Sequence, residues 1–282
     1  MKIVLLEEFP NKVNLENKLE ELDSPVNLIV AAPCLQDFER IRDKLKAEEV
    51  ILGYWPLLPK NMGYWLSPFS DRKGLEQVVD EIKQAEPPLD VLWDAEPPIY
   101  DKSHVLGIIK SLIKGKWREN AEYIKESLHN LSDSGINLVT AEWPISPDKQ
   151  YITGLSGALI HKLSQYKHPA ALLEFLMENL CLKFDPDEFR TEKMEMAYSR
   201  QYDEFKRICE QGKAKYSNRF SIGIGCLGFG IKGNENQLSE KQLYKYLQIA
   251  ASTGIPKAYI YRLGGATEQH LKVLRAFLQG NI

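Results

Sequence analysis

Short apolar segments recur along this chain, and stretches with helical periodicity separate them. We count eight such segments, and most are rich in Leu or β-branched residues without clean polar alternation. That composition is typical of parallel strands whose two faces are both covered. Eight strand-helix units in 282 residues predict a single (β/α)8 barrel, the TIM-barrel architecture, spanning 1–282 as one domain. The predicted strands are residues 2–7, 26–32, 49–55, 90–96, 136–142, 194–198, 220–229 and 257–262.

The segments between these strands have the spacing of amphipathic helices. Apolar residues recur every three or four positions in residues 35–47, 73–85 and 240–251. Ser239 precedes the last of these and is a candidate N-cap. We expect two helices in each of the longer connections, 102–134 and 146–192. An open doubly wound sheet usually has a glycine-rich turn after its first strand, whereas EEFPNK follows here.

The charge balance and the cysteines exclude several classes of protein. The chain has 36 Lys and Arg against 39 Asp and Glu, so it has no basic excess for a nucleic acid or an anionic membrane surface. No segment reaches the roughly 20 uninterrupted apolar residues of a membrane span. The four cysteines form no C-x-x-C pair, and neither they nor the five histidines have metal-ligand spacing. We therefore expect a cytoplasmic protein with reduced cysteines and no metal site.

The predicted fourth strand ends in the sequence DVLWDAEPP, which carries two carboxylates two residues apart. Alternation along a strand puts Asp94 and Glu96 on one face. Two like charges on one face cost free energy through repulsion and desolvation, so a role outside stability is indicated. Such a pair is typical of carboxylate catalysis or of a site for a cation or a polyhydroxylated ligand. A solvated strand end is the alternative.

In a barrel of this kind, the active site is built from the carboxyl ends of the strands and the loops that follow them. Acidic, aromatic and polar side chains gather at the predicted ends. The candidate site residues are Glu8, Tyr54, Trp55, Trp65, Asp94, Glu96, Glu142, Trp143, Tyr198, Gln201 and Arg262.

Carboxylates beside aromatic rings suit a carbohydrate, because sugar rings stack on aromatic faces while their hydroxyls hydrogen-bond to acids. The loop GYWPLLPKNMGYWLSPF alone carries Trp55, Tyr64, Trp65 and Phe69. Any one of them could instead pack in the core, as large aromatic residues commonly do. Their crowding favours a platform for a small-molecule or oligosaccharide substrate, without a cofactor.

These residues resemble part of the chitinase-type glycoside hydrolases of family 18. That family carries D-x-x-D-x-D-x-E at the end of strand four and a Met-x-Tyr element on strand six. Asp94 and Glu96 match the last two positions of the first motif, and Met196-Ala197-Tyr198 matches the second. The resemblance implies that Glu96 is the general acid, that Asp94 orients a substrate acetamido group, and that Tyr198 hydrogen-bonds to it.

The chain also departs from that family pattern. Leu89 and Leu92 stand at the first two acidic positions, Ser199 follows the tyrosine where Asp is usual, and KAYIYRLGG lacks the expected Trp. These departures keep open a non-catalytic carbohydrate-binding or scaffold protein on the same barrel.

Other residues at the strand ends suggest a second catalytic carboxylate, a magnesium site or a phosphate-binding loop. Neighbouring strands lie roughly 5 Å apart, so Glu142 could cooperate with Glu96 on a glycosidic bond. Asp94, Glu96 and Glu142 could alternatively hold Mg²⁺ through oxygen ligands. Gly264 and Gly265, with Arg262 nearby, have the composition of a phosphate-binding loop after strand eight, which would suit an enzyme acting on a phosphorylated metabolite.

Overall fold

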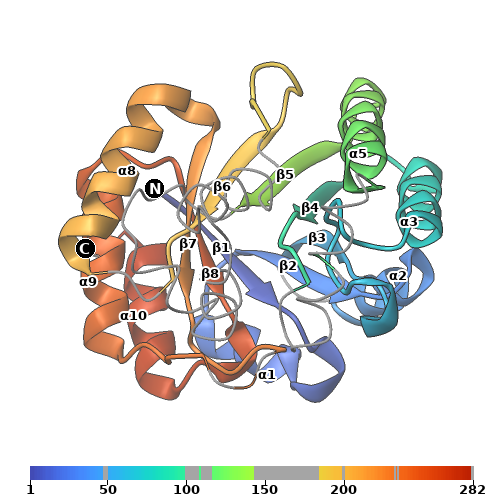
Figure 1. The fold of residues 1–282 in the computed structure, drawn as a ribbon. Helices are drawn as coiled ribbons and strands as arrows, with labels where there is room; N and C mark the ends of the chain where they lie inside the picture. Colours follow the sequence, from blue (N-terminus) through green and yellow to red (C-terminus); the bar gives the residue numbers. More distant parts are fainter. Residues whose placement is uncertain are drawn as a thin grey trace, which may run out of the picture.

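The computed structural model describes residues 1–46, 50–98, 108, 116–142, 184–198, 201–231, 233 and 235–280. Eight parallel strands pair in sequence order and close into a barrel, with β1 hydrogen-bonded to β8 (Figure 1). The prediction of a (β/α)8 barrel is therefore confirmed. The strands are β1 (Lys2–Glu7), β2 (Val26–Ala32), β3 (Val50–Pro56), β4 (Asp90–Asp94), β5 (Asn137–Glu142), β6 (Glu192–Met196), β7 (Phe220–Gly225) and β8 (Lys257–Tyr261).

Helices surround the barrel on the outside (Figure 1). The described α-helices are α1 (Leu15–Leu22), α2 (Leu35–Lys44), α3 (Arg72–Gln84), α5 (Lys116–Asp133), α8 (Tyr202–Tyr216), α9 (Glu240–Ser252) and α10 (Glu268–Leu278). The second helix expected in 102–134, and both expected in 146–192, lie largely outside the described residues. No helix in the described ranges has the length and hydropathy to cross a membrane.

Local signals in the sequence explain where the helices begin. The Ser239 hydroxyl accepts the Gln242 N–H and the Gln242 side chain accepts the Ser239 N–H, which is a capping box at the start of α9. Thr267 caps α10 in the same way with His270. The His270 Nδ1 accepts the Thr267 N–H at 3.1 Å, so its other ring nitrogen, Nε2, carries the proton that is donated to the Leu238 carbonyl at 2.9 Å. His270 thereby ties α10 to the end of the loop after β7.

Apolar side chains form two separate clusters because alternate residues of each strand face opposite sides. Leu5, Leu28 and Val91 belong to the larger cluster, between the strands and the helices. Leu6 and Leu92 belong to the smaller cluster inside the barrel. This alternation decides which polar residues at the strand ends face the barrel interior.

Three strands end at least two residues earlier than predicted. β4 ends at Asp94, β6 ends at Met196 and β7 ends at Gly225. Glu96 and Tyr198 consequently lie just past their strands, in the segments that form the mouth of the barrel.

Candidate active site

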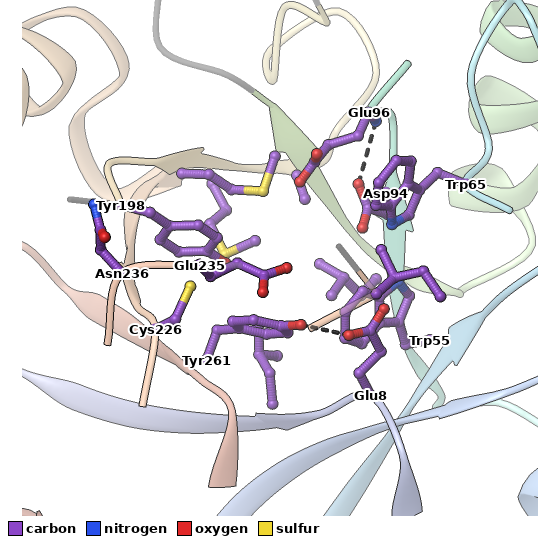
Figure 2. Close-up of a pocket in the computed structure, with 16 residues that line it drawn as sticks. Glu8, Trp55, Trp65, Asp94, Glu96, Tyr198, Cys226, Glu235, Asn236 and Tyr261 are labelled. Carbon is purple, nitrogen blue, oxygen red and sulfur yellow. Dashed lines mark hydrogen bonds between the residues drawn. The ribbon is translucent and has the colours of Figure 1, made fainter. Parts of the chain in front are cut away.

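A cavity of about 230 Å³ opens at the carboxyl ends of the strands. Figure 2 shows Trp55 and Trp65 on one side of it together with Glu8, Asp94 and Glu96. Tyr198, Tyr261 and Cys226 lie on the other side, and Glu235 lies between them. Leu6, Leu92, Met194 and Met196 are among its apolar lining. The acidic and aromatic residues that line it are Glu8, Asp94, Glu96, Glu235, Trp55, Trp65, Tyr198 and Tyr261.

Glu8 lies immediately after β1 and is 4% exposed. The Tyr64 hydroxyl donates to its Oε1 at 2.8 Å, and the Tyr261 hydroxyl donates to its Oε2. Burial raises the pKa of Glu8 and the charge of Glu96 adds to that shift, while the hydrogen bonds from the two tyrosines oppose it. A buried carboxyl with a raised pKa is a common feature of a functional site.

Asp94 and Glu96 both line the cavity, as their spacing predicted. Asp94 is 2% exposed, and its Oδ1 accepts the backbone N–H of Glu96 at 3.2 Å. Glu96 is only half-buried. Asp94 therefore fixes the backbone from which the Glu96 side chain extends, and the more exposed of the two carboxyls is the one that an incoming ligand meets first.

The long loop after β3 is fastened to β4 by two hydrogen bonds. The Trp93 Nε1 donates to the Leu66 carbonyl at 3.0 Å, and the Leu66 N–H donates to the Asp94 carbonyl at 2.8 Å. These bonds hold Trp65 over the cavity beside the carboxylates, as Figure 2 shows. The expectation that this loop supplies an aromatic wall agrees with the placement of Trp55 and Trp65.

Tyrosine rings form the opposite wall. Tyr198 stacks on Tyr261 with ring centroids 5.7 Å apart, and Trp55 meets Tyr261 edge-on at 6.3 Å. Burial raises the pKa of Tyr198 well above its usual range, and the nearby Cys226 and acidic groups, Glu96 first among them, add to the shift. The Tyr198 phenol therefore stays neutral.

Two predicted site residues face away from the cavity. Asp94 pairs in register with Ala141, so Ala141 faces the cavity and Glu142 points outward. There Glu142 forms an ion pair with Lys193, 2.5 Å from Nζ to Oε2, with side chains 0% and 2% exposed. The expected cooperation of Glu142 with Glu96 is wrong for this geometric reason.

Tyr54 is the second of these. It is fully buried on the outer face of β3, where its ring lies 5.1 Å from that of Phe38. Within the described part of the chain its hydroxyl has no hydrogen-bond partner. Gln201 is exposed at the start of α8 and does not line the cavity. Trp143 lies outside the described residues.

The expected phosphate loop after β8 already holds a carboxylate. Glu7 Oε2 accepts the Gly264 N–H at 2.5 Å, and Glu7 Oε1 accepts from Arg262 at 2.9 Å. The Gly265 and Ala266 N–H groups donate to carbonyls within the same turn. Arg262 also donates to the Phe229 carbonyl and does not line the cavity. The predicted phosphate and substrate contacts at this loop are therefore not supported.

Sequence reasoning missed several cavity residues. Cys226, Glu235 and Asn236 come from the loop after β7, and Tyr261 ends β8. A Cβ placed on Gly230 would lie 2.0 Å from the Tyr261 hydroxyl, 2.9 Å from Glu235 Oε1 and 3.1 Å from Glu8 Oε2. Only a glycine brings this loop so close to the acidic groups. The GFG sequence was a usable signal of such an approach.

The magnesium alternative gains nothing from the geometry. Within the described ranges, no three His, Cys, Asp or Glu side chains are close enough together to hold a metal ion. Glu142, one of the three ligands considered, is on the other side of the strand.

Comparison with known proteins gives the fold. No protein-family model matches the chain, and no curated protein matches it. A chitinase candidate from Desulfitobacterium hafniense DCB-2 aligns through its C-terminal domain with a TM-score of 0.54 and 11% identity, over 98% of both chains. The spore cortex-lytic enzyme SleL of Bacillus cereus aligns with a TM-score of 0.54 and 12% identity, over 97% of this chain and 73% of its own. A xylose isomerase domain protein from Planctomyces limnophilus aligns with a TM-score of 0.50 and 12% identity, over 99% and 95%. At such identities these matches show a shared barrel.

Proposed function

We propose that this barrel is a glycoside hydrolase-like enzyme that cleaves a carbohydrate at the cavity, with Glu96 as the general acid. One observation carries the proposal: Asp94 and Glu96 line a cavity whose walls are tryptophan and tyrosine rings. Aromatic faces bind the apolar side of a sugar, and paired carboxyl groups are the usual machinery for a glycosidic bond. The likeness to a chitinase candidate and to a spore cortex-lytic enzyme supports this at the level of fold alone.

The reaction assigns a separate task to each group. The Glu96 carboxyl gives its proton to the glycosidic oxygen as the bond to the anomeric carbon breaks. The Asp94 carboxylate, held by the Glu96 N–H, stabilises the positive charge that develops on the sugar. The neutral Tyr198 hydroxyl donates a hydrogen bond to the substrate. Water adds to the anomeric carbon and its proton passes to a carboxylate of the site, which balances the hydrolysis.

Glu96→Gln tests the acid directly. The amide keeps the shape of the side chain but has no acidic proton, so turnover of a glycoside with a poor leaving group should fall roughly 10²–10⁴-fold. An activated aryl glycoside should lose much less, because its leaving group needs little protonation. Asp94→Asn should impair both substrates. Glu39→Gln, on the outer helix α2 with an exposed partner in Arg42, is the matched control and should change neither rate.

Two alternatives remain as outcomes of the same assay. If wild type turns over no glycoside in a broad panel while a sugar binds beside Trp55 and Trp65, the protein is a carbohydrate-binding barrel and not an enzyme. Leu89 and Leu92, at two positions where the family motif has acids, agree with that outcome. If Glu96→Gln leaves the turnover of both kinds of glycoside unchanged, the acid is another carboxyl of the cavity.

Free thiols at Cys34, Cys209 and Cys226 agree with the cytoplasmic location that we propose.

A further inference from the structure

Glu8 connects two parts of the barrel mouth that are far apart in the sheet. The Tyr64 hydroxyl donates to its Oε1 at 2.8 Å, and the Tyr261 hydroxyl donates to its Oε2. Tyr64 belongs to the loop after β3, whereas Tyr261 ends β8, and these two strands are not neighbours in the barrel. One carboxyl group therefore receives a hydroxyl from each of two separate segments.

Each of these tyrosines contacts a ring of the cavity wall. Tyr64 meets Trp65 edge-on with ring centroids 5.4 Å apart, and Tyr261 stacks on Tyr198 at 5.7 Å. Trp65 and Tyr198 line opposite sides of the cavity, and Figure 2 shows the hydrogen bond from Tyr261 reaching across to Glu8. The position of Glu8 thus influences the rings on both sides.

The chemistry of a carboxylate suits this arrangement. Its two oxygens are both acceptors, so each can take one hydroxyl, whereas the amide of Gln has a single acceptor oxygen and an NH₂ group that only donates. Hydrogen bonds to an ionised acceptor are also shorter and stronger than those between neutral groups. A glutamate at position 8 can therefore hold two phenols at once, which a glutamine cannot do.

The surroundings fix Glu8 and exclude water from it. Glu7 Oε2 accepts the Gly264 N–H at 2.5 Å, which fastens the end of β1 to the loop after β8. A Cβ placed on Gly230 would lie 3.1 Å from Glu8 Oε2 and 2.0 Å from the Tyr261 hydroxyl, so the loop after β7 packs directly on this hydrogen bond. Because Glu8 is only 4% exposed, little water competes with the two hydroxyls for its oxygens.

We propose that Glu8 is a positioning residue, which holds the aromatic rings on the two sides of the cavity at a fixed separation through the hydroxyls of Tyr64 and Tyr261. That separation decides how a sugar ring lies relative to Glu96, and a misplacement of about 1 Å can reduce turnover about 10²-fold. The proposal deepens the function proposed above by adding a residue to the same site. It rests on that function only where turnover is measured.

The first test needs no ligand. Near-ultraviolet circular dichroism at the long-wavelength edge, where tryptophan alone absorbs, reports on Trp55 and Trp65, which contact the two tyrosines. Glu8→Gln should change this signal while the far-ultraviolet spectrum stays that of wild type. The double variant Tyr64→Phe/Tyr261→Phe should change it as well. Adding Glu8→Gln to the double variant should change it no further, because without the hydroxyls the carboxyl has no ring to hold.

Matched controls and single variants complete this test. Glu21→Gln changes an exposed acid on α1, and Tyr244→Phe removes a hydroxyl that bonds to Gln248 on α9, so both should keep the wild-type tryptophan signal. A wild-type signal in Glu8→Gln overturns the proposal. If Glu8→Gln does not fold, Tyr64→Phe and Tyr261→Phe decide singly, and two unaltered spectra overturn the proposal.

Kinetics separates positioning from direct catalysis by Glu8. Glu8→Gln should lower turnover roughly 10–100-fold, and equally for a poor leaving group and an activated aryl glycoside, because Glu8 gives no proton to the leaving group. In the Tyr64→Phe/Tyr261→Phe background, the same change should alter turnover by less than about twofold. A loss of full size in that background would mean that Glu8 acts on the substrate itself, which overturns the proposal.

The two tests keep this inference distinct from the proposed reaction. If wild type turns over no glycoside, the hydrolase is contradicted and the tryptophan signal alone decides the role of Glu8. If wild type turns over a glycoside while Glu8→Gln keeps the wild-type tryptophan signal, the hydrolase stands and the positioning role is wrong.

Discussion

Replacing Lys193 by Met should destabilise the fold by about 3–5 kcal/mol, because it leaves a buried carboxylate without its charged partner. Lys193 Nζ lies 2.5 Å from Glu142 Oε2 and also donates to the Phe184 carbonyl at 3.2 Å. After the change, Glu142 keeps one described hydrogen bond, from the Thr140 hydroxyl at 3.0 Å. Both charged side chains are almost completely excluded from water, so solvent cannot replace the lost ammonium group.

A double-mutant cycle gives the measurement. Urea unfolding of wild type, Lys193→Met, Glu142→Leu and the double variant yields the four free energies of unfolding. The double variant should recover most of the loss, because apolar replacement of a whole buried ion pair is often neutral or stabilising by about 1–4 kcal/mol. Lys206→Met removes an exposed partner of Glu210 and is the control, with an expected change within about 0.5 kcal/mol.

Two results would refute this reasoning. A loss of stability below about 1 kcal/mol for Lys193→Met would lie in the range of exposed ion pairs. It would mean that water reaches the Glu142 carboxylate and replaces the lost ammonium group. Additive losses in the double variant would mean that the two residues are not coupled. Turnover per folded molecule should also stay unchanged in the double variant, because Glu142 faces away from the cavity. A loss of turnover would return Glu142 to the list of catalytic residues.

Three other changes test particular contacts. Gly230→Ala should lower turnover roughly 10–100-fold, because the new Cβ would displace the Tyr261 hydroxyl from Glu8. Circular dichroism should show an intact fold, and an unaltered rate would show that the loop moves aside freely. Burial lowers the pKa of His270, so the stability that its neutral form contributes is complete above about pH 6.5 and is lost as the pH falls through the lower pKa of the folded state. Urea unfolding on either side of that pH should therefore vary more steeply in wild type than in His270→Gln, and equal slopes would contradict the assignment. Tyr54→Phe should leave the free energy of unfolding unchanged or raise it by up to about 1 kcal/mol, because the lost hydroxyl has no described partner; a clear loss would reveal one.

The barrel could be predicted from the sequence because most strands are apolar runs and every link between strands is long enough for a helix, although β6, with the sequence EKMEM, has no such run. The site could be predicted only in part. Asp94 and Glu96 were found because their spacing puts both on one face of a strand, and the same face carries Leu92 into the barrel. Glu142 and Tyr54 were selected for lying near strand ends, which says nothing about the face of the strand.

Register would have excluded Glu142, but register is a long-range property. Asp94 of β4 pairs with Ala141 of β5, and no local sequence pattern encodes this pairing between strands. The same limit applies to Glu235, which reaches the cavity because the loop after β7 folds back across the mouth of the barrel. A loop residue of this kind becomes visible only when the closed barrel brings β7, β8 and β1 together.

The neighbouring residues Glu7 and Glu8 show how the barrel sorts identical groups. Both are buried, and nothing in the sequence distinguishes them. The pleat turns Glu7 outward to the guanidinium of Arg262 and the N–H of Gly264, which neutralise and bind it. It turns Glu8 inward to two phenols, where its pKa rises and its charge is uncompensated by an ion pair within the described residues. Since burial costs both carboxyls free energy and, among the described residues, only the outward one forms an ion pair, the inward one has its best explanation in a ligand.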